Sequence, residues 1–325
     1  MDEQRPRAHR GRTLQGVPCL VLGAGGFVGT NLCRALQAQG AGVHGFGRRQ
    51  SYPEALGRIP WTQGDFSDRA ALARVVDGHE VIFHLVGGSL PDSSNKDPVA
   101  NVMDCIVASL HLLEICRASG VRKIVFLSSG GTVYGAPSKI PIPETAQTDP
   151  ISAYGISKLA VEKYLNLYRH LHGLDYVALR VSNPYGPYQS PTRRQGIVAA
   201  VLQKVLDRQE VEIWGTGEVV RDFIFIDDVV DAIIAAAGYN GPHQVFNVGS
   251  GVGRTMLQIV EDIRLILDCR HIEIVYRPAR AVDVPVNVLD TTLIHEQIGW
   301  APRIGWIEGL RATSSWLLSS GKPPA

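Results

Sequence analysis

The sequence predicts an α/β protein built on a doubly wound parallel sheet, followed by a smaller, mixed α/β lobe toward the carboxyl end. Two observations support this fold class. Short apolar runs alternate with longer amphipathic stretches through the first half of the chain, and this rhythm changes after about residue 180. Because buried strands that alternate with helices form parallel sheets covered on both faces, the first half should be doubly wound.

The elements of the first half follow from these two patterns in order. Strands are expected at residues 19–22, 43–46, 81–85, 123–127 and 176–179, where the apolar runs are short. Helices are expected between them, at residues 27–39, 69–76, 99–118 and 157–172. Each strand is thus followed by enough chain for the crossover that parallel pairing requires.

The second half begins with a loop rich in Pro, Gly and Tyr, after which helices are mixed with very short strands. Helices are expected at residues 197–206, 229–237, 256–267 and 291–298. The chain then divides into three parts: a flexible basic tail (1–15), a sheet domain (16–181 plus about 222–250), and a lobe over the carboxyl edge of the sheet (182–221 plus about 251–325).

Charge and hydropathy exclude several classes of protein. Lysine and arginine number 32 against 31 aspartate and glutamate, so the basic excess typical of a nucleic-acid-binding protein is missing. The amino-terminal tail is basic but has no apolar segment of the kind that a secretory signal needs. No apolar run approaches the ~20 residues of a membrane span; the richest candidate, 229–237, is short and interrupted by Asp231.

The cysteines and histidines predict no metal site and no disulfide framework. Five cysteines are scattered without a CxxC pair, and ten histidines show no ligand spacing. Unpaired cysteines in this number fit a reducing cytoplasm.

A glycine-rich loop predicts a dinucleotide site. Gly23, Gly26 and Gly29 are spaced G-x-x-G-x-x-G directly after the first predicted strand, and Phe27 and Val28 open the helix that follows. Glycines at this strand–helix junction allow a tight turn and close backbone approach to a pyrophosphate, which the helix N-terminus then stabilises. In this context the pattern is typical of a Rossmann-type domain that binds NAD or NADP.

The choice between the two dinucleotides depends on the end of the second strand. The acidic residue that usually binds the ribose 2′-hydroxyl is absent, and Arg48 and Arg49 follow Gly47 instead. Two guanidinium groups suit a 2′-phosphate, which favours NADP over NAD. The alternative is that both arginines are solvated loop charges and that Gly47 permits either cofactor. Asp65 and Phe66, after the third short strand, are expected near the adenine.

A tyrosine and a lysine four residues apart predict the catalytic groups. Tyr154 and Lys158 open a helix, and this spacing places both side chains on one face. A phenol has an ordinary pKa of about 10, and a neighbouring ammonium lowers that pKa. The same lysine can hydrogen-bond the nicotinamide ribose. Such a pair can deprotonate a carbinol while a hydride leaves to the cofactor.

With these motifs the chain resembles the extended short-chain dehydrogenase/reductase superfamily, and within it the nucleotide-sugar epimerase/dehydratase family typified by UDP-glucose 4-epimerase. The resemblance covers about residues 17–312. It depends on the glycine loop, Gly64-Asp65, His84-Leu85, residues 128–135 (SSGGTVYG), Tyr154 with Lys158, Asn183-Pro184, residues 221–223 and residues 280–283. It implies that Leu85 also contacts the cofactor.

One departure from the family concerns the hydroxyl that polarises the sugar oxygen. The resemblance implies a catalytic Ser or Thr three residues before Val133, where this chain has Gly130. Ser129 and Thr132 flank the position and are both candidates, with Thr132 preferred. The alternative is that both hydroxyls only cap the loop backbone. Gly131 and Thr132 stand where dehydratases carry an Asp-Glu pair, which disfavours 4,6-dehydration.

The resemblance also implies a substrate site for a nucleotide-diphosphate sugar, linked to UDP, GDP or dTDP. Arg221 and Arg280 are expected to bind the diphosphate bidentately, although either could form an ion pair of the fold instead. The remaining substrate residues implied are Asn183 at the diphosphate, Trp214 at the nucleobase, Gln195 on the sugar side, and Asp283 beside Arg280.

Three functions remain open from the sequence. The preferred one is a C4 epimerase in which Tyr154 is the general base and a bound nicotinamide takes and returns a hydride. The alternative is an NADPH-dependent reductase of a nucleotide 4-keto-6-deoxy-sugar, which the arginines after the second strand favour. The third is a protein that binds the cofactor but has lost catalysis, and Gly130 is the only residue that supports it. The resemblance also implies a homodimer in which helices 99–118 and 157–172 of the two chains are in contact. It implies a cytoplasmic enzyme that supplies sugars for polysaccharide synthesis.

Overall fold

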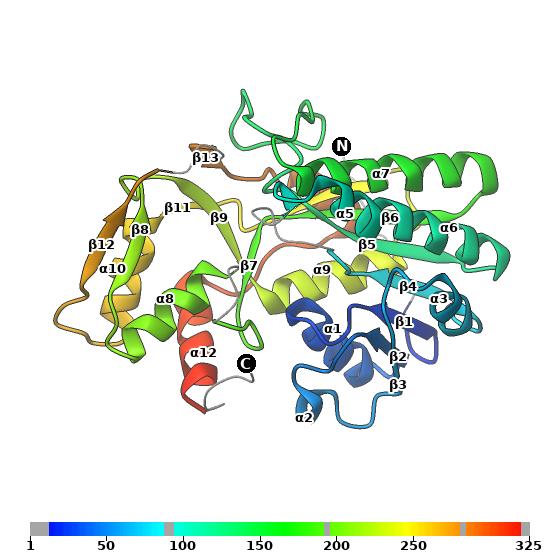
Figure 1. The fold of residues 1–325 in the computed structure, drawn as a ribbon, viewed down its shortest axis with the longest axis horizontal. Coiled ribbons are helices and arrows are strands. Elements are labelled where there is room, and N and C mark those ends of the chain that lie inside the picture. Colours follow the sequence, from blue (N-terminus) through cyan, green and yellow to red (C-terminus); the bar gives the residue numbers. More distant parts are fainter. Residues whose placement is uncertain (1–12, 88–93, 192–195, 280–283, 320–325) are drawn as a thin grey trace, which may run out of the picture.

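The fold is that of a computed structural model, which describes residues 13–87, 94–191, 196–279 and 284–319 (Figure 1). Residues 1–12 of the predicted basic tail and three predicted substrate residues, Gln195, Arg280 and Asp283, lie outside these described residues.

A seven-stranded parallel sheet forms the larger part of the molecule, which confirms the predicted doubly wound sheet. Its strands, in spatial order, are β10 (Val245–Val248), β6 (Asp175–Val181), β5 (Lys123–Ser129), β4 (Val81–His84), β1 (Pro18–Leu22), β2 (Gly42–Gly47) and β3 (Trp61–Gln63). Strands β3 and β10 were not among the five strands whose ranges were predicted. Every neighbouring pair is parallel. The order reverses between β1 and β4, the switch point where such sheets bind ligands.

Helices cover both faces of the sheet, because successive strand residues point to opposite sides. Cys19 and Val21 of β1 face one apolar core, whereas Leu20 and Leu22 face the other. The first core lies under α1 (Phe27–Ala38) and α9 (Ile226–Gly238), and the second under α3 (Arg69–Val76), α6 (Ala108–Ala118) and α7 (Ala153–His172). Figure 1 shows the sheet between these two layers.

The smaller lobe follows the sheet domain and carries two short sheets (Figure 1). One contains β7 (Asn183–Tyr185), β9 (Val220–Phe225), β11 (Gly253–Thr255) and β13 (Val286–Asn287); the other pairs β8 (Val211–Trp214) with β12 (Ile274–Arg277). The helices here are α8 (Ile197–Leu206), α10 (Met256–Ile266), α11 (Thr292–Ile298) and α12 (Trp306–Ser319). Neither α12 nor the short α2 (Pro53–Leu56) was expected from the sequence.

Two helices begin earlier than the sequence predicts. Helix α7 begins at Ala153 rather than at residue 157, because the Ser152 side chain caps it by accepting from the Gly155 N–H at 3.2 Å. Helix α9 begins at Ile226 rather than at 229. The earlier start of α7 places Tyr154 and Lys158 on the same helix, one turn apart.

One helical run is longer and more apolar than expected. Helices α5 (Pro98–Asn101), η1 (Val102–Val107) and α6 are continuous from Pro98 to Ala118, 21 residues with a mean hydropathy of 1.6 over the most apolar window. By length and composition alone this helix could cross a membrane, which corrects the expectation that no run approaches that size. In the structure 44% of the window is buried inside the molecule.

Candidate active site

The phosphate loop joins β1 to α1 with the geometry that a pyrophosphate needs. Gly23 has a φ of +86°, a conformation that favours glycine, and its N–H donates to the Phe46 carbonyl at 2.9 Å. A Cβ on Gly29 would lie 2.2 Å from the Gly23 carbonyl. The helix can therefore approach the strand this closely only because residue 29 has no side chain. Gly26 caps α1 with no side chain and no acidic residue follows in the first turn, which leaves the helix N-terminus suited to an anion.

The carboxyl end of β2 passes beside this loop. A Cβ on Gly25 would lie 1.9 Å from the Arg49 carbonyl, so the two backbones are in direct contact. The side chains of Arg48 and Arg49 are exposed at this edge, where the ribose of a dinucleotide on the loop would lie.

The residues predicted near the adenine divide into one at the surface and one in the core. The Asp65 carboxylate is exposed and accepts hydrogen bonds from the N–H and hydroxyl of Ser67, which lower its pKa with help from the charge of Arg48. The Phe66 ring is buried, 4.8 Å from the His84 ring between centroids. Phe66 therefore has only its backbone to offer to a ligand, because its ring belongs to the core.

Tyr154 and Lys158 lie on one face of α7, as predicted. Lys158 Nζ is 5.7 Å from the centroid of the Tyr154 ring and donates to the Leu127 carbonyl at 2.8 Å, at the end of β5. The Lys158 side chain is 2% exposed and its Nζ lies 4.8 Å from the Phe126 ring centroid. A Cβ on Gly87 would lie 3.9 Å from Tyr154 Oη, at van der Waals distance, so Gly87 lies beside the phenol.

The pKa values of the dyad depart from the prediction. Burial raises the pKa of the Tyr154 phenol and lowers the pKa of Lys158. The expected lowering of the phenol's pKa by Lys158 is not present in this state, because the ammonium points to a backbone carbonyl and desolvation dominates. A positive charge bound next to the phenol would lower its pKa and so favour the phenolate.

Residues 128–135, which we call the catalytic loop, comprise the last two residues of β5 and the turn that follows, and they contain Gly130, where a hydroxyl was expected. A Cβ on Gly130 would lie 2.5 Å from Leu289 Cδ1 and 2.9 Å from the Arg180 carbonyl, so Leu289 occupies the space of a serine side chain. Thr132 Oγ1 is buried and has no hydrogen-bond partner among the described residues. A buried hydroxyl without a partner is unusual in a native structure, and this one is available to a ligand oxygen if its rotamer turns.

Thr132 also lies against the start of α7. A Cβ on Gly155 would lie 2.7 Å from the Thr132 carbonyl, so the loop packs directly on the helix beside Tyr154. Ser129, the other candidate, is partly exposed at the end of β5. The helix N-terminus is itself held, because Ser94 Oγ accepts from the Tyr154 N–H at 3.0 Å and Asn95 Oδ1 from the Ala153 N–H at 2.8 Å.

Two of the predicted substrate residues lie on neighbouring strands. Asn183 of β7 donates to the Asp222 carbonyl of β9 at 2.9 Å, and Arg221 precedes that residue. Arg221 Nη1 donates to the carbonyls of Val220 and Val284, at 2.9 and 2.6 Å. Trp214 is 42% exposed and ends β8 in the separate two-stranded sheet.

Three buried polar residues near the site were given no role from the sequence: Asp222, Glu162 and Arg180. Asp222 accepts from Ser250 through both the N–H and the hydroxyl and from the Leu289 N–H at 3.3 Å, so it holds the segment that fills the Gly130 space. Burial raises the pKa of Asp222. Glu162 and Arg180 form a buried ion pair at 2.7 Å. Glu162 could have been found, since it follows Lys158 by four residues on the same helix face.

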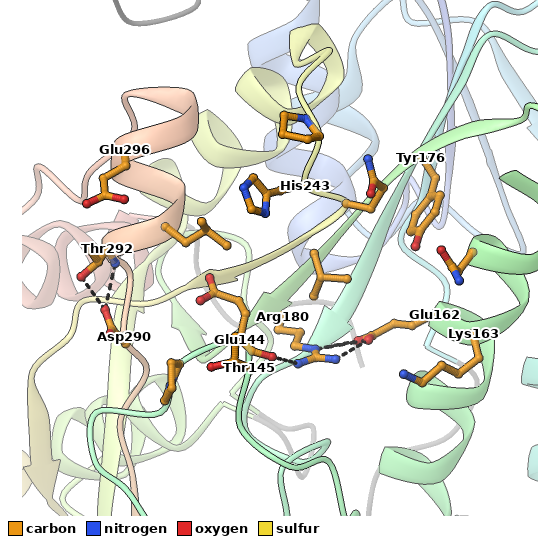
Figure 2. A pocket seen from close by; sticks show the side chains of 16 residues that line it. Glu144, Thr145, Glu162, Lys163, Tyr176, Arg180, His243, Asp290, Thr292 and Glu296 are labelled. Carbon is orange, nitrogen blue, oxygen red and sulfur yellow. Dashed lines mark hydrogen bonds and ion pairs between the residues drawn. The ribbon is translucent and has the colours of Figure 1, made fainter. Parts of the chain in front are cut away.

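A separate cavity of about 560 Å³ lies at the β10 edge of the sheet (Figure 2). Its lining comes from α7, β6, β10, α11 and the segment around Glu144, and includes Arg180, His243 and Glu296. Neither Tyr154 nor any residue of the phosphate loop lines it. Among the described residues, no group of three or more His, Cys, Asp or Glu side chains could hold a metal ion.

Comparisons with known proteins agree with this geometry. The model of the NAD dependent epimerase/dehydratase family matches residues 19–249. UDP-glucose 4-epimerase of Mycolicibacterium smegmatis is 36% identical over 302 residues, covering 90% of this chain and 96% of that protein. A dTDP-4-dehydro-6-deoxyglucose reductase of Escherichia coli is 29% identical over 303 residues, covering 90% and 94%.

Solved structures give the same result. UDP-glucose 4-epimerase of Thermotoga maritima with UDP-glucose has a TM-score of 0.89 at 36% identity, covering 93% of this chain and 99% of that one. The Thermus thermophilus UDP-glucose 4-epimerase complex with NAD has a TM-score of 0.87 at 30% identity, with the same coverage.

Proposed function

Because the chain belongs to the NAD dependent epimerase/dehydratase family, we propose that it interconverts UDP-hexoses that differ at C4. The predicted class, a nucleotide-sugar C4 epimerase, is confirmed by the epimerases among its relatives and structural neighbours. The observation that carries the mechanism is the position of Tyr154 and Lys158 on one face of α7, at the carboxyl end of a sheet whose first strand leads into the phosphate loop.

Tyr154 acts on the C4 hydroxyl of the sugar. Its phenolate oxygen takes the hydroxyl proton as the C–H bond at C4 breaks, and returns it when that bond reforms on the other face. NAD supplies the hydride acceptor and donor, so no net oxidation occurs. Lys158 donates to the Leu127 carbonyl in this state. We propose that it turns from this carbonyl toward the nicotinamide ribose and the phenol when the cofactor binds, so that its charge then stabilises the phenolate.

The Thr132 hydroxyl donates to the same sugar oxygen. Its Oγ1 is buried without a partner, whereas the space at Gly130 is filled by Leu289. A hydroxyl from the residue two positions later therefore replaces the one that the family carries at residue 130. Ser129 is the second candidate for this role.

The smaller lobe binds the nucleotide. Arg221 and Asn183, on adjacent strands, are proposed at the diphosphate, together with Arg280 and Asp283, and Trp214 is proposed to stack on the base. Gln195 is proposed on the sugar side. These roles keep the division expected from the sequence, with residues 182–221 and about 251–325 forming the substrate lobe.

NAD is the proposed dinucleotide, although the sequence favoured NADP. The family is NAD-dependent, and a relative of 30% identity has been solved with NAD. The exposed side chains of Arg48 and Arg49 are then surface charges at the ribose edge.

The identity of the dinucleotide is tested by denaturing freshly purified protein and identifying the released cofactor by its mass. We expect NAD at up to one equivalent per chain. Released NADP, or an empty protein that binds NADPH more tightly than NAD, would overturn the choice of cofactor and favour the reductase.

The activity is tested by incubating UDP-galactose with the protein and following UDP-glucose by chromatography. We expect conversion to an equilibrium mixture without added reductant and without net NADH production. Conversion of a dTDP-4-keto-6-deoxy-sugar with stoichiometric NADPH consumption, and no epimerisation, would instead establish the reductase.

A homodimer formed through α5, η1, α6 and α7 is also proposed. Large apolar side chains on these helices are exposed: Val99, Met103, Ile156, Leu167 and Leu171 are between 42% and 74% accessible. An exposed apolar surface of this kind marks an interaction site. Sedimentation should give about twice the chain mass, and Met103→Glu should shift it toward the monomer.

The five free cysteines support a cytoplasmic location.

A further inference from the structure

A buried ion pair lies behind the catalytic loop. Arg180 of β6 and Glu162 of α7 have side chains that are 5% and 3% exposed. Arg180 Nε lies 3.1 and 3.2 Å from the two carboxylate oxygens of Glu162, and Nη2 lies 2.7 Å from Oε2 (Figure 2). This fork geometry fixes the orientation as well as the distance of the two side chains.

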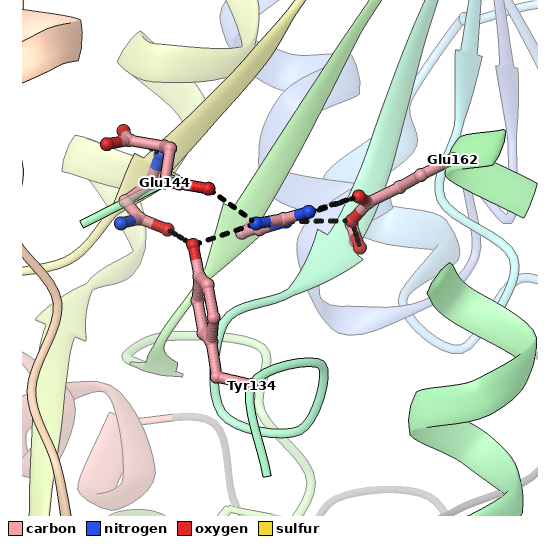
Figure 3. Close-up of polar contacts among 6 residues, drawn as sticks. Tyr134, Glu144 and Glu162 are labelled. Carbon is pink, nitrogen blue, oxygen red and sulfur yellow. Dashed lines mark hydrogen bonds and ion pairs between the residues drawn. The ribbon is translucent and has the colours of Figure 1, made fainter. Parts of the chain in front are cut away.

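The same pair contacts both ends of the catalytic loop. Ser128, at the start of the loop, donates its hydroxyl to Glu162 Oε1. Arg180 Nη1 donates to the Tyr134 hydroxyl, near the end of the loop, at 3.0 Å (Figure 3). Between these two anchors lie Ser129, Gly130 and Thr132, so the ion pair holds the segment that carries the candidate hydroxyls.

Through Glu162 the pair is also anchored on α7, the helix that carries Tyr154 and Lys158. Glu162 lies one turn after Lys158 on α7, and the Thr132 carbonyl packs on Gly155 in the first turn of the same helix. We propose that the Arg180–Glu162 ion pair is a positioning device that sets the Thr132 hydroxyl relative to Tyr154 and Lys158. This inference rests on the proposed epimerase mechanism and deepens it.

A second layer of hydrogen bonds keeps the partners of Arg180 in place. The Tyr134 hydroxyl donates to Asn247 Oδ1 at 2.7 Å while it accepts from Arg180. The Asn247 N–H donates to Glu144 Oε1 at 2.7 Å, and the Glu144 carbonyl accepts from Arg180 at 3.4 Å (Figure 3). Burial raises the pKa of Tyr134 to about 12, so the phenol remains the donor that this arrangement needs.

The pair also influences the charge of Lys158. Burial lowers the pKa of Lys158, whereas Cys105 and the negative charge of Glu162 raise it. Tyr154 and His84 are the other titratable groups beside the ammonium. Loss of the Glu162 charge removes this support for the ammonium, so the pKa of Lys158 should fall further. A role in positioning therefore has a signature in the pH profile, which loss of stability alone would not produce.

The test compares Arg180→Met and Glu162→Gln with Lys123→Met in the holoenzyme. Lys123 is a buried cation on β5, paired with Asp175 of β6 at the other end of the same two strands. We expect kcat for epimerisation to fall about 10- to 100-fold in the first two variants. The KM for UDP-galactose and the bound NAD should stay within about twofold, and Lys123→Met should keep wild-type kcat.

The pH profile and a milder variant complete the test. Glu162→Gln should move the high-pH limb of kcat to lower pH, whereas Lys123→Met should not. Tyr134→Phe removes only the hydroxyl that Arg180 contacts, and should lower kcat in a protein that still folds. Wild-type kcat in Tyr134→Phe and Glu162→Gln, with an unshifted pH profile, would overturn the proposal. The epimerase mechanism itself is tested by a different result, because it would be overturned by full activity in Tyr154→Phe.

Discussion

The strand pair β5–β6 carries a buried cation at each end, and the two ends use it differently. At the amino end, Lys123 pairs with Asp175 at 2.9 Å and also donates to the Tyr239 carbonyl, just after α9. At the carboxyl end, Arg180 pairs with Glu162 at 2.7 Å and reaches Tyr134. Both cations are almost fully buried, so both require a partner.

The difference lies in what each pair joins. Lys123 and Asp175 are direct neighbours in the strand register, so their contact joins strands that the sheet already holds together. Arg180 and Glu162 join a strand to a helix. Through Ser128 near the end of β5 and Tyr134 beyond it, they also hold both ends of the turn that follows β5. The carboxyl end of a parallel sheet is where loops form the site, so the same chemistry stabilises the fold at one end and arranges reacting groups at the other.

The largest effect should come from the carboxyl end, in Tyr154→Phe. Loss of the general base is expected to lower kcat by about 10²–10⁴. Tyr168→Phe is the matched control on the same helix, since it removes only a hydroxyl that donates to Glu114. Steady-state epimerisation rates measure the difference, and equal rates in the two variants would falsify the assignment of Tyr154.

Thr132→Val should have the next largest effect. It removes a hydrogen bond to an oxygen that gains charge, worth about 1.5–3 kcal/mol, or about 10- to 100-fold in kcat. Thr132→Ser should recover most of the activity because it restores the hydroxyl. If Ser129→Ala lowers kcat more than Thr132→Val does, the polarising hydroxyl belongs to Ser129.

At the amino end, Lys123→Met should change stability and not activity. The lost charge-assisted hydrogen bonds should cost about 1.5–3 kcal/mol in the free energy of unfolding. Asp175 is 38% exposed and can be hydrated once its partner is gone, which limits the loss. Urea denaturation measures it; a loss of kcat beyond about twofold would contradict the division between the two ends.

A pH-dependent loss of stability is expected from His84, at the carboxyl end of β4. Burial lowers the pKa of His84 well below 6.5, with the charge of Lys158 adding to the effect. The unfolded chain therefore binds more protons than the folded one below pH 6.5. Stability should fall with decreasing pH there, by up to about 1.4 kcal/mol per pH unit.

The comparison that isolates His84 is the slope of unfolding free energy between pH 7 and 5.5. His84→Gln should flatten this slope relative to wild type, whereas substitution of the exposed His170 by Gln should leave it unchanged. Equal slopes in all three proteins would contradict a buried neutral imidazole.

The smallest effect should come from Arg48→Ala at the end of β2. If NAD is the cofactor, its affinity should change less than about twofold, because no 2′-phosphate is present to pair with the guanidinium. The affinity for NADP should fall about tenfold. Titration calorimetry with both dinucleotides measures this, with Arg58→Ala as the exposed control; a tenfold loss for NAD would place Arg48 on the cofactor itself.

The sequence by itself determined the alternation of strands and helices, the phosphate loop and the Tyr154–Lys158 spacing. These features are local: a periodicity of two or 3.6 residues, or a fixed offset along one helix, is written in consecutive residues. The local motif also showed that Gly130 stands where a hydroxyl residue was expected. It did not show what occupies the space of the missing side chain.

Only the tertiary structure decided the rest. Leu289 fills the space at Gly130 from 159 positions along the chain, the Phe66 ring turns into the core, and Arg180 joins the catalytic loop to α7. The direction in which the pKa of Tyr154 shifts also depended on its burial and on the carbonyl to which Lys158 donates. Such contacts arise when distant segments pack together, and the loss of water around a group, which sets its pKa, exists only after that packing.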